Sequence, residues 1–161
     1  MAKTHDLTHT VNETSLLSQD DLYLFNEGTH FHLYDKLGAH PVKRGGVSGT
    51  TFGVWTPDAA EVSVIGVFND WKPGAHPLHM REHSGIWEGF LPGVGKGDLY
   101  KFHIRSRFND YQVEKTDPFA IFNEIPPKTA SIVWDCEYAW RDAEWMKPRR
   151  AHNALDAPQS V

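Results

Sequence analysis

Short apolar runs separated by turn-forming residues recur along residues 45–134, and no long helical pattern lies between them. The clearest run spans residues 99–105, where Tyr100, Phe102 and Ile104 alternate with charged or polar residues. An apolar side chain at every second position predicts a half-buried strand. Such runs at roughly ten-residue intervals predict an all-β fold, an antiparallel β-sandwich. The expected strands are residues 50–55, 61–68, 78–81, 86–91, 99–105, 119–122 and 130–134.

A short helix is expected before the strands. Ser18 and Asp21 have the spacing of a helix capping box, and acidic residues in a first turn suit the helix dipole. Gly28 is a natural stop. Residues 29–41 are interpreted as a docking segment rather than a regular element. We therefore expect an arm with a short helix and docking segment at 1–44, the sandwich at 45–137, and an exit segment and linker at 138–161.

The composition argues against several partners. A net charge of -5 does not suit a nucleic-acid-binding protein, which needs a clustered positive field. No run of residues is long and apolar enough to span a bilayer, and the N-terminal residues do not resemble a secretory signal. The single cysteine, Cys136, allows no internal disulfide and fits a reducing compartment. We expect no nucleic-acid or membrane partner and a cytoplasmic location.

No pattern predicts catalysis, a cofactor or a metal site. The glycine-rich residues 92–98 lack the spacing of a phosphate-binding loop and lead into a strand instead of a helix. His30 and His32 would share a face of an extended segment, but a metal site needs three or four converging ligands. Asp117 precedes Pro118 and is interpreted as part of a turn rather than as a catalytic acid.

The candidate binding feature is Trp71, which follows the turn-forming residues Asn69 and Asp70 at the end of an expected strand. A tryptophan after a turn is exposed more often than one inside a strand, and an exposed indole can stack on the apolar face of a pyranose ring. Lys101 points outward by the alternation of its strand, and Asn69 could supply an amide. In the alternative interpretation, Trp71 folds back to cap the sandwich or covers a neighbouring domain. The residues alone favour neither.

Other tryptophans have different settings. Trp55, Trp87 and Trp134 lie inside expected strands, so we expect them to pack in the core or on a sheet face. Trp140 and Trp145 lie in the exit segment and could anchor it to the sandwich.

An ordered set of segments extends over about residues 46–135: Val64–Trp71, Pro77–Leu78, Gly85–Glu88, Leu91–Gly93 and Gly97–Phe102. This set resembles the family-48 carbohydrate-binding module, which precedes the catalytic barrel in many family-13 glycoside hydrolases. The flanking segments Gly28–His40 and Thr116–Ala120 resemble those of bacterial 1,4-α-glucan (glycogen) branching enzymes.

The resemblance implies an immunoglobulin-like sandwich that binds α-glucan and is followed by the enzyme's own catalytic barrel. The parent enzyme would cut an α-1,4 chain and rejoin it through an α-1,6 bond. Barrel motifs are missing here, so the fragment alone is expected to be inactive. In glycogen-binding relatives a Trp after Phe-Asn and a Lys after Tyr contact the sugar, and these match Trp71 and Lys101.

The rest of that sugar site matches less well. Only Tyr111 could replace a second aromatic residue of those relatives, and their Asn near the final strand corresponds to Thr129-Ala130-Ser131. The resemblance therefore implies weak binding, with a dissociation constant of about 1 mM.

Alternatives remain open at this point. The domain could mainly support the barrel after losing its sugar site, as the exit-segment tryptophans and the histidine-rich lead-in suggest. The same module could also belong to another family-13 enzyme, such as a debranching enzyme, or an unrelated sandwich domain could share the pattern.

Overall fold

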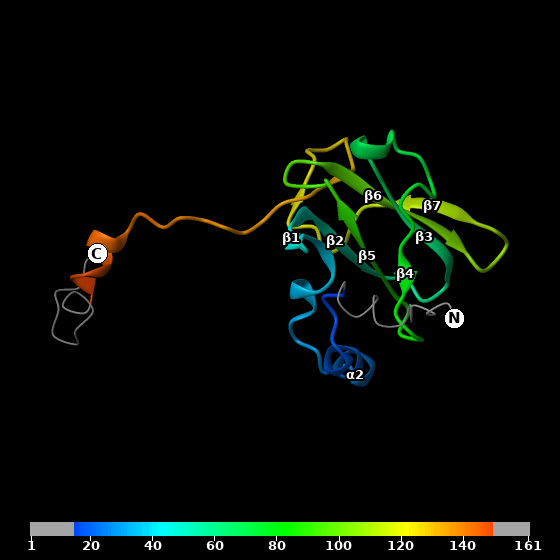
Figure 1. Ribbon diagram of the computed structural model, residues 1–161, viewed down its shortest axis with the longest axis horizontal. Coiled ribbons are helices and arrows are strands. Elements are labelled where there is room, and N and C mark those ends of the chain that lie inside the picture. Colours follow the sequence, from blue (N-terminus) through cyan, green and yellow to red (C-terminus); the bar gives the residue numbers. More distant parts are fainter. Residues whose placement is uncertain (1–14, 150–161) are drawn as a thin grey trace, which may run out of the picture.

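A computed structural model describes residues 15–149. Two antiparallel sheets face each other as a sandwich (Figure 1), which confirms the predicted fold with its short N-terminal helix. The first sheet has the strand order β1-β2-β5-β4, and the second has β3-β6-β9-β8 with β7 also paired to β6. The strands are β1 Gly38–Arg44, β2 Val47–Trp55, β3 Ala59–Gly66, β4 His79–Met80, β5 Ile86–Pro92, β6 Leu99–Ser106, β7 Gln112–Lys115, β8 Phe122–Asn123 and β9 Ser131–Ile132. The helical elements are α2 Gln19–Glu27, η1 Leu33–Asp35, η2 Val67–Asn69 and α3 Ala143–Met146.

Helix α2 begins and ends where its sequence predicts. The Asp21 backbone N–H donates to Ser18 Oγ at 3.1 Å, and the Ser18 backbone N–H donates to Asp21 Oδ2 at 2.8 Å. Gly28 ends the helix in the left-handed region with φ 73°, a conformation that glycine adopts without steric penalty. The predicted capping box and stop are both confirmed.

The main core lies between the two sheets and is built around aromatic side chains. The ring of Tyr100 meets those of Phe52 and Phe102 edge to face, with centroid separations of 5.0 and 5.8 Å. All three residues have 0% exposure, so the alternation read in residues 99–105 correctly assigns the inner face of β6. Trp87 also belongs to this core, as predicted.

A second apolar cluster covers the face of the first sheet that points away from the second. It is formed by Leu17, Leu22, Leu37 and Ile86, with Phe25 of α2 packed against it. Because Ile86 precedes the core residue Trp87 on β5, the two side chains point to opposite faces of the strand. Helix α2 and the segments beside it therefore close the outer face of this sheet.

Two strands lie outside the sequence expectation. Edge strand β1 takes in the last four residues, 38–41, of the expected irregular docking segment, and its Pro41 pairs with Thr50 of β2. Proline is tolerated on an edge strand because its missing N–H can face solvent. Strand β7 pairs with β6 through Gln112–Lys115, but its sequence is too polar to form an apolar run.

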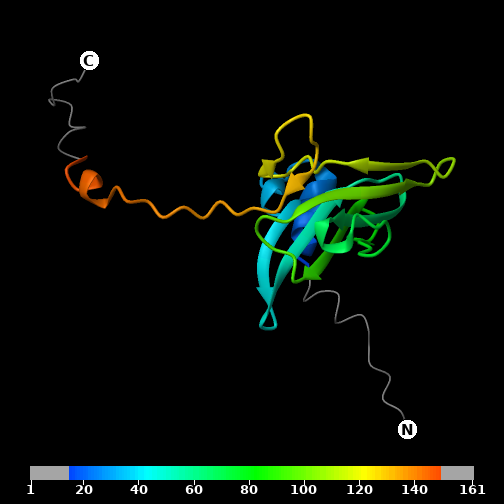
Figure 2. The ribbon, with the colours of Figure 1, turned by 90° about the horizontal axis from the view of Figure 1, so that it is seen from above.

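Trp55 and Trp134 were expected in the core or on a sheet face, and the core alternative is wrong for both. Trp55 is 54% exposed at the end of β2, and Trp134 is 36% exposed just after β9. Trp55 instead packs edge to face on Phe25 of α2, with ring centroids 6.0 Å apart. Trp140 is 76% exposed on an extended segment that leaves the sandwich (Figure 2), and Trp145 is 64% exposed in α3 beyond it, so they do not anchor the exit segment.

Candidate functional site

The loop that carries Trp71 connects β3 to β4 and begins with η2 (Figure 1). Asp70 and Trp71 both have left-handed backbones, with φ of 52° and 57°. Each such non-glycine residue costs roughly 1–2 kcal/mol of strain. The Trp71 backbone N–H donates to the Gly66 carbonyl at 2.9 Å. The loop is therefore held tightly against the end of β3 despite its strain.

Asn69 is the residue that fixes this loop. Its Oδ1 accepts from the Gly66 backbone N–H at 2.9 Å, and its Nδ2 donates to the Val64 carbonyl at 3.0 Å. Its Nδ2 also lies 2.8 Å from His76 Nδ1. The amide is thus occupied inside the loop, and the sugar-contact role predicted for Asn69 stays a prediction.

The side chain of Trp71 is half-buried and belongs to neither apolar cluster of the sandwich. Further along the same loop, the Gly74 backbone N–H donates to Ser63 Oγ at 3.0 Å. The Val64 backbone N–H donates to the His76 carbonyl at 2.9 Å, and the Leu78 backbone N–H donates to the Val62 carbonyl at 2.8 Å, so the loop runs along the edge of β3. The indole accordingly lies outside the hydrophobic interior, on a loop bonded at both ends.

Lys101 lies on the outer face of the second sheet, as its alternation predicts. Its β6 strand pairs with β3 so that Lys101 faces Ile65 and Tyr100 faces Gly66. Since Trp71 bonds to Gly66, the two residues that match the sugar contacts of relatives lie at the same end of this strand pair. Lys101 Nζ is 4.0 Å from Glu114 Oε2 on β7, a partner that the sequence reasoning missed because β7 was not predicted.

Tyr111 lies at the other end of β6. It is 62% exposed in the hairpin that projects from the sandwich between β6 and β7 (Figure 2). Its carbonyl accepts from the Ser106 backbone N–H at 2.8 Å. From Lys101 to Ser106 the strand extends roughly 17 Å at 3.3 Å per residue. The structure therefore does not bring Tyr111 together with Trp71 and Lys101, and its sugar-contact role stays a prediction.

A second group of polar residues is enclosed beneath β6. Tyr100 Oη donates to Asp117 Oδ2 at 2.5 Å, and Asp117 Oδ1 accepts from the Phe119 backbone N–H at 2.8 Å. Burial raises the pKa of Asp117, although the Tyr100 hydrogen bond opposes the rise. Burial and the nearby Asp117 carboxylate also raise the pKa of Tyr100. With exposures of 0% and 3%, Tyr100 and Asp117 cannot meet a substrate, so this pair braces the fold.

The histidines bond to separate partners. His30 Nε2 lies 2.8 Å from Asp21 Oδ1, whereas His32 Nδ1 lies 2.8 Å from Tyr34 Oη. Within residues 15–149, no group of three or more His, Cys, Asp or Glu side chains is arranged to hold a metal ion. No helix in the same range is long and apolar enough to cross a membrane.

Comparison with protein families and with curated proteins gives consistent results. Residues 36–120 match the family described as carbohydrate-binding module 48 (isoamylase N-terminal domain). The chain is 50% identical over 147 residues to the 1,4-alpha-glucan branching enzyme GlgB of Rubrobacter xylanophilus, covering 91% of this chain and 20% of the relative. It is 49% identical over 148 residues to the GlgB of Aquifex aeolicus, covering 91% and 23%. The chain therefore spans about a fifth of the length of these curated relatives.

Among solved structures, the chain resembles Klebsiella pneumoniae pullulanase complexed with maltotriose. The TM-score is 0.50 at 30% sequence identity, and the match covers 62% of this chain and 10% of the pullulanase. The pullulanase of Klebsiella oxytoca gives the same TM-score of 0.50 and the same identity of 30%, with the same coverage of 62% and 10%.

Proposed function

The chain belongs to the carbohydrate-binding module 48 family, and from this premise we propose that it is the accessory α-glucan-binding module of a glycogen branching enzyme. In this role the module holds an α-1,4-glucan chain near the catalytic barrel of the parent enzyme and performs no chemistry itself. Support comes from the branching-enzyme relatives, which match about 90% of the chain.

The observation that carries the proposal is the position of Trp71. Its indole lies outside both apolar clusters, on a loop fixed by Asn69, at the same end of the β3–β6 pair as Lys101. An indole face can cover the apolar C–H face of a glucose ring, while an ammonium group donates hydrogen bonds to its hydroxyls. Two such contacts on one rigid edge suit weak, reversible binding of a glucan chain.

The test is a titration of the 161-residue chain with maltoheptaose, with binding measured by NMR or calorimetry. Trp71→Ala is expected to weaken binding at least about tenfold, since tryptophans at the centre of a contact contribute most of its energy. Trp140→Ala is the matched control, because Trp140 is 76% exposed on the exit segment and should leave the affinity unchanged. No binding of the wild-type chain at millimolar sugar, or full binding by Trp71→Ala, would contradict the proposal.

A second candidate function is support of the catalytic barrel, and a separate surface favours it. Exposed Ile121, Phe122, Trp134 and Tyr138 line a groove of about 470 Å³ where the chain leaves the sandwich. Apolar patches of this kind commonly mark contacts between domains. In the parent enzyme, removing the module would then lower the melting temperature of the remainder. An unchanged melting temperature would leave only the sugar-binding role.

A further inference from the structure

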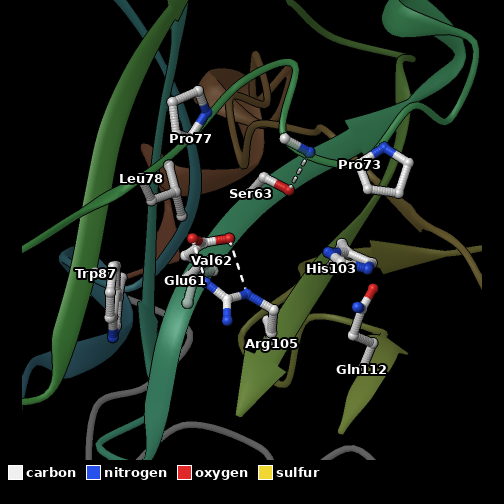
Figure 3. A pocket seen from close by; sticks show the side chains of 11 residues that line it. Glu61, Val62, Ser63, Pro73, Pro77, Leu78, Trp87, His103, Arg105 and Gln112 are labelled. Atoms are coloured by element: carbon white, nitrogen blue, oxygen red, sulfur yellow. Dashed lines mark hydrogen bonds and ion pairs between the residues drawn. The ribbon is translucent and has the colours of Figure 1, made fainter. Parts of the chain in front are cut away.

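A hollow of about 530 Å³ extends along β3 beyond the Trp71 loop (Figure 3). Its volume lies within the range of about 300–1,000 Å³ that is typical of small-ligand sites. Pro73 and the outward-facing His103 and Gln112 form one side of the hollow, and Pro77 and Leu78 form the other. Sequence reasoning did not assign a binding role to His103 or Gln112, because β6 and β7 bring them together only in the folded chain.

Trp71 and Lys101 do not line the hollow, but near neighbours on the same loop and the same strand do. Pro73 follows Trp71 by two residues on the same loop, and His103 follows Lys101 by two residues on the same face of β6. Residues two apart on a strand are separated by about 7 Å. A linear ligand lying on Trp71 and Lys101 therefore has a direct path along β6 toward His103 and Gln112.

The two charged residues that line the hollow, Glu61 and Arg105, form an ion pair. Arg105 Nη1 donates to Asp110 Oδ1 at 2.8 Å, and Arg105 Nε donates to Glu61 Oε2 at 3.0 Å. The Arg105 hydrogen bonds lower the pKa of Glu61, so its carboxylate stays ionised opposite the guanidinium. A site with both charges already paired offers neither an anion nor a cation a strong net attraction. It instead presents donors and acceptors to a neutral ligand with many hydroxyls.

The side chains beside this ion pair suit the same ligand. His103 and the Gln112 amide can each donate and accept hydrogen bonds. Pro73 and Pro77 add apolar surface to which the C–H groups of a sugar ring can pack. Such a mixture of apolar walls with a few polar groups is usual for specific small-molecule sites.

We propose that this hollow holds further glucose units of an α-1,4-glucan chain whose first units bind at Trp71 and Lys101. The inference rests on the proposed function, which it extends from a single contact point to a longer groove. It makes the module selective for longer chains, because short oligosaccharides occupy the Trp71 end alone.

The experiment compares maltotriose with maltoheptaose on the 161-residue chain, using NMR titration of the wild type and of two variants. The combined change His103→Ala, Gln112→Ala is expected to weaken maltoheptaose binding about threefold to tenfold, equivalent to one or two hydrogen bonds, and to leave maltotriose unchanged. Trp71→Ala is expected to weaken the binding of both maltotriose and maltoheptaose. A longer sugar can bind a single site in several positions, which raises its apparent affinity even without an extended groove. The quantity compared is therefore the ratio of variant to wild-type affinity for each sugar.

The control is His79→Ala, which removes an exposed histidine of β4 in the other sheet and should change neither affinity. Circular dichroism and thermal unfolding verify that each variant is folded. Equal weakening for both sugars, or none for either, overturns the extended groove while the Trp71 site stands. If the wild-type chain binds neither sugar, the proposed function fails and the groove fails with it.

Discussion

The outer faces of the two sheets differ in how far the rest of the chain covers them. On the first sheet, α2 and the preceding segment bury Leu22 and Ile86 and even enclose charged residues. There Arg81 Nε lies 3.0 Å from Glu88 Oε1, and Ser15 Oγ donates to Glu88 Oε2 at 2.9 Å. On the second sheet, Lys101, His103 and Arg105 remain partly exposed. The Trp71 loop folds against this sheet along the edge of β3.

The difference indicates which face is available to a ligand. A face closed by the chain's own helix contributes to stability and offers no free surface, whereas a face of β6 left to its polar side chains can exchange water for sugar hydroxyls. Changes on the first face should therefore alter the free energy of unfolding, and changes on the second should alter binding. The predictions below run from the largest expected effect to the smallest.

Ile86→Ala is expected to produce the largest loss of stability. The side chain is fully buried under α2, and removing it leaves a cavity that costs about 2–5 kcal/mol of unfolding free energy. Urea denaturation measures the change, with Ile125→Ala, which is 85% exposed, as the control. A loss below about 1 kcal/mol would mean that the helix does not close this face.

Tyr100→Phe tests the layer between the two faces. It removes the hydroxyl donor of the buried Asp117 carboxyl, and the expected loss at neutral pH is about 1–3 kcal/mol. Because burial raises the pKa of Asp117 above its ordinary 3.8, stability contributed by this group is highest at low pH. It declines as pH rises through the folded-state pKa.

The hydroxyl of Tyr100 limits this decline, since its hydrogen bond favours the ionised carboxyl. The difference in unfolding free energy between wild type and Tyr100→Phe should therefore be larger at pH 7 than at pH 4. Denaturation at the two pH values measures it, and a difference independent of pH would contradict the assignment.

Asp21→Ala tests the anchoring of the covering helix. Burial alone would raise the pKa of Asp21, but hydrogen bonds from Ser18, Lys36 and His30 together lower it well below 3.8. Losing the capping box is expected to cost about 0.5–2 kcal/mol. Because the pKa of Asp21 is lower in the folded state than in the unfolded state, its carboxylate stabilises the fold at pH values above the unfolded-state pKa of 3.8. The difference in unfolding free energy between wild type and Asp21→Ala should therefore shrink as the pH falls below 3.8. A penalty that grows in acid would rule this account out.

Glu114→Gln is expected to have the smallest effect on stability. The Lys101–Glu114 pair is separated by 4.0 Å and Glu114 is half-exposed, so the change in unfolding free energy should stay below about 1 kcal/mol. Removing the carboxylate also leaves Lys101 freer to bond a sugar, so maltoheptaose affinity should rise slightly or stay constant. A marked fall in affinity would indicate that Glu114 itself contacts the ligand.

Sequence patterns predicted most of the scaffold, because local rules determine it. The Ser18 capping box, the Gly28 stop and the alternation around Phe102 each act within a few residues. Strand β1 was missed because Pro41 interrupts its pattern, which only an edge position tolerates. Whether Trp55 and Trp134 belong to the core or to an outer face could not be decided, because a strand pattern does not report which face is covered.

The candidate site was less accessible to sequence reasoning. The proximity of Trp71 to the Lys101 strand follows from the pairing of Gly66 with Tyr100, a long-range register that no local pattern contains. Tyr111 is close to Lys101 in sequence, but the β6–β7 hairpin carries it to the far end of the strand. His103 and Gln112 meet only because β7 pairs with β6.

The left-handed backbone at Asp70 and Trp71 has one consequence for recognition. Because folding has already fixed the loop, a sugar that binds to the indole does not have to order a flexible segment. The binding surface is preorganised. A flexible loop would lose conformational entropy each time it bound a sugar, whereas this loop has already lost that entropy when the protein folded. A shallow site with few contacts can then still retain a glucan chain, and release it quickly.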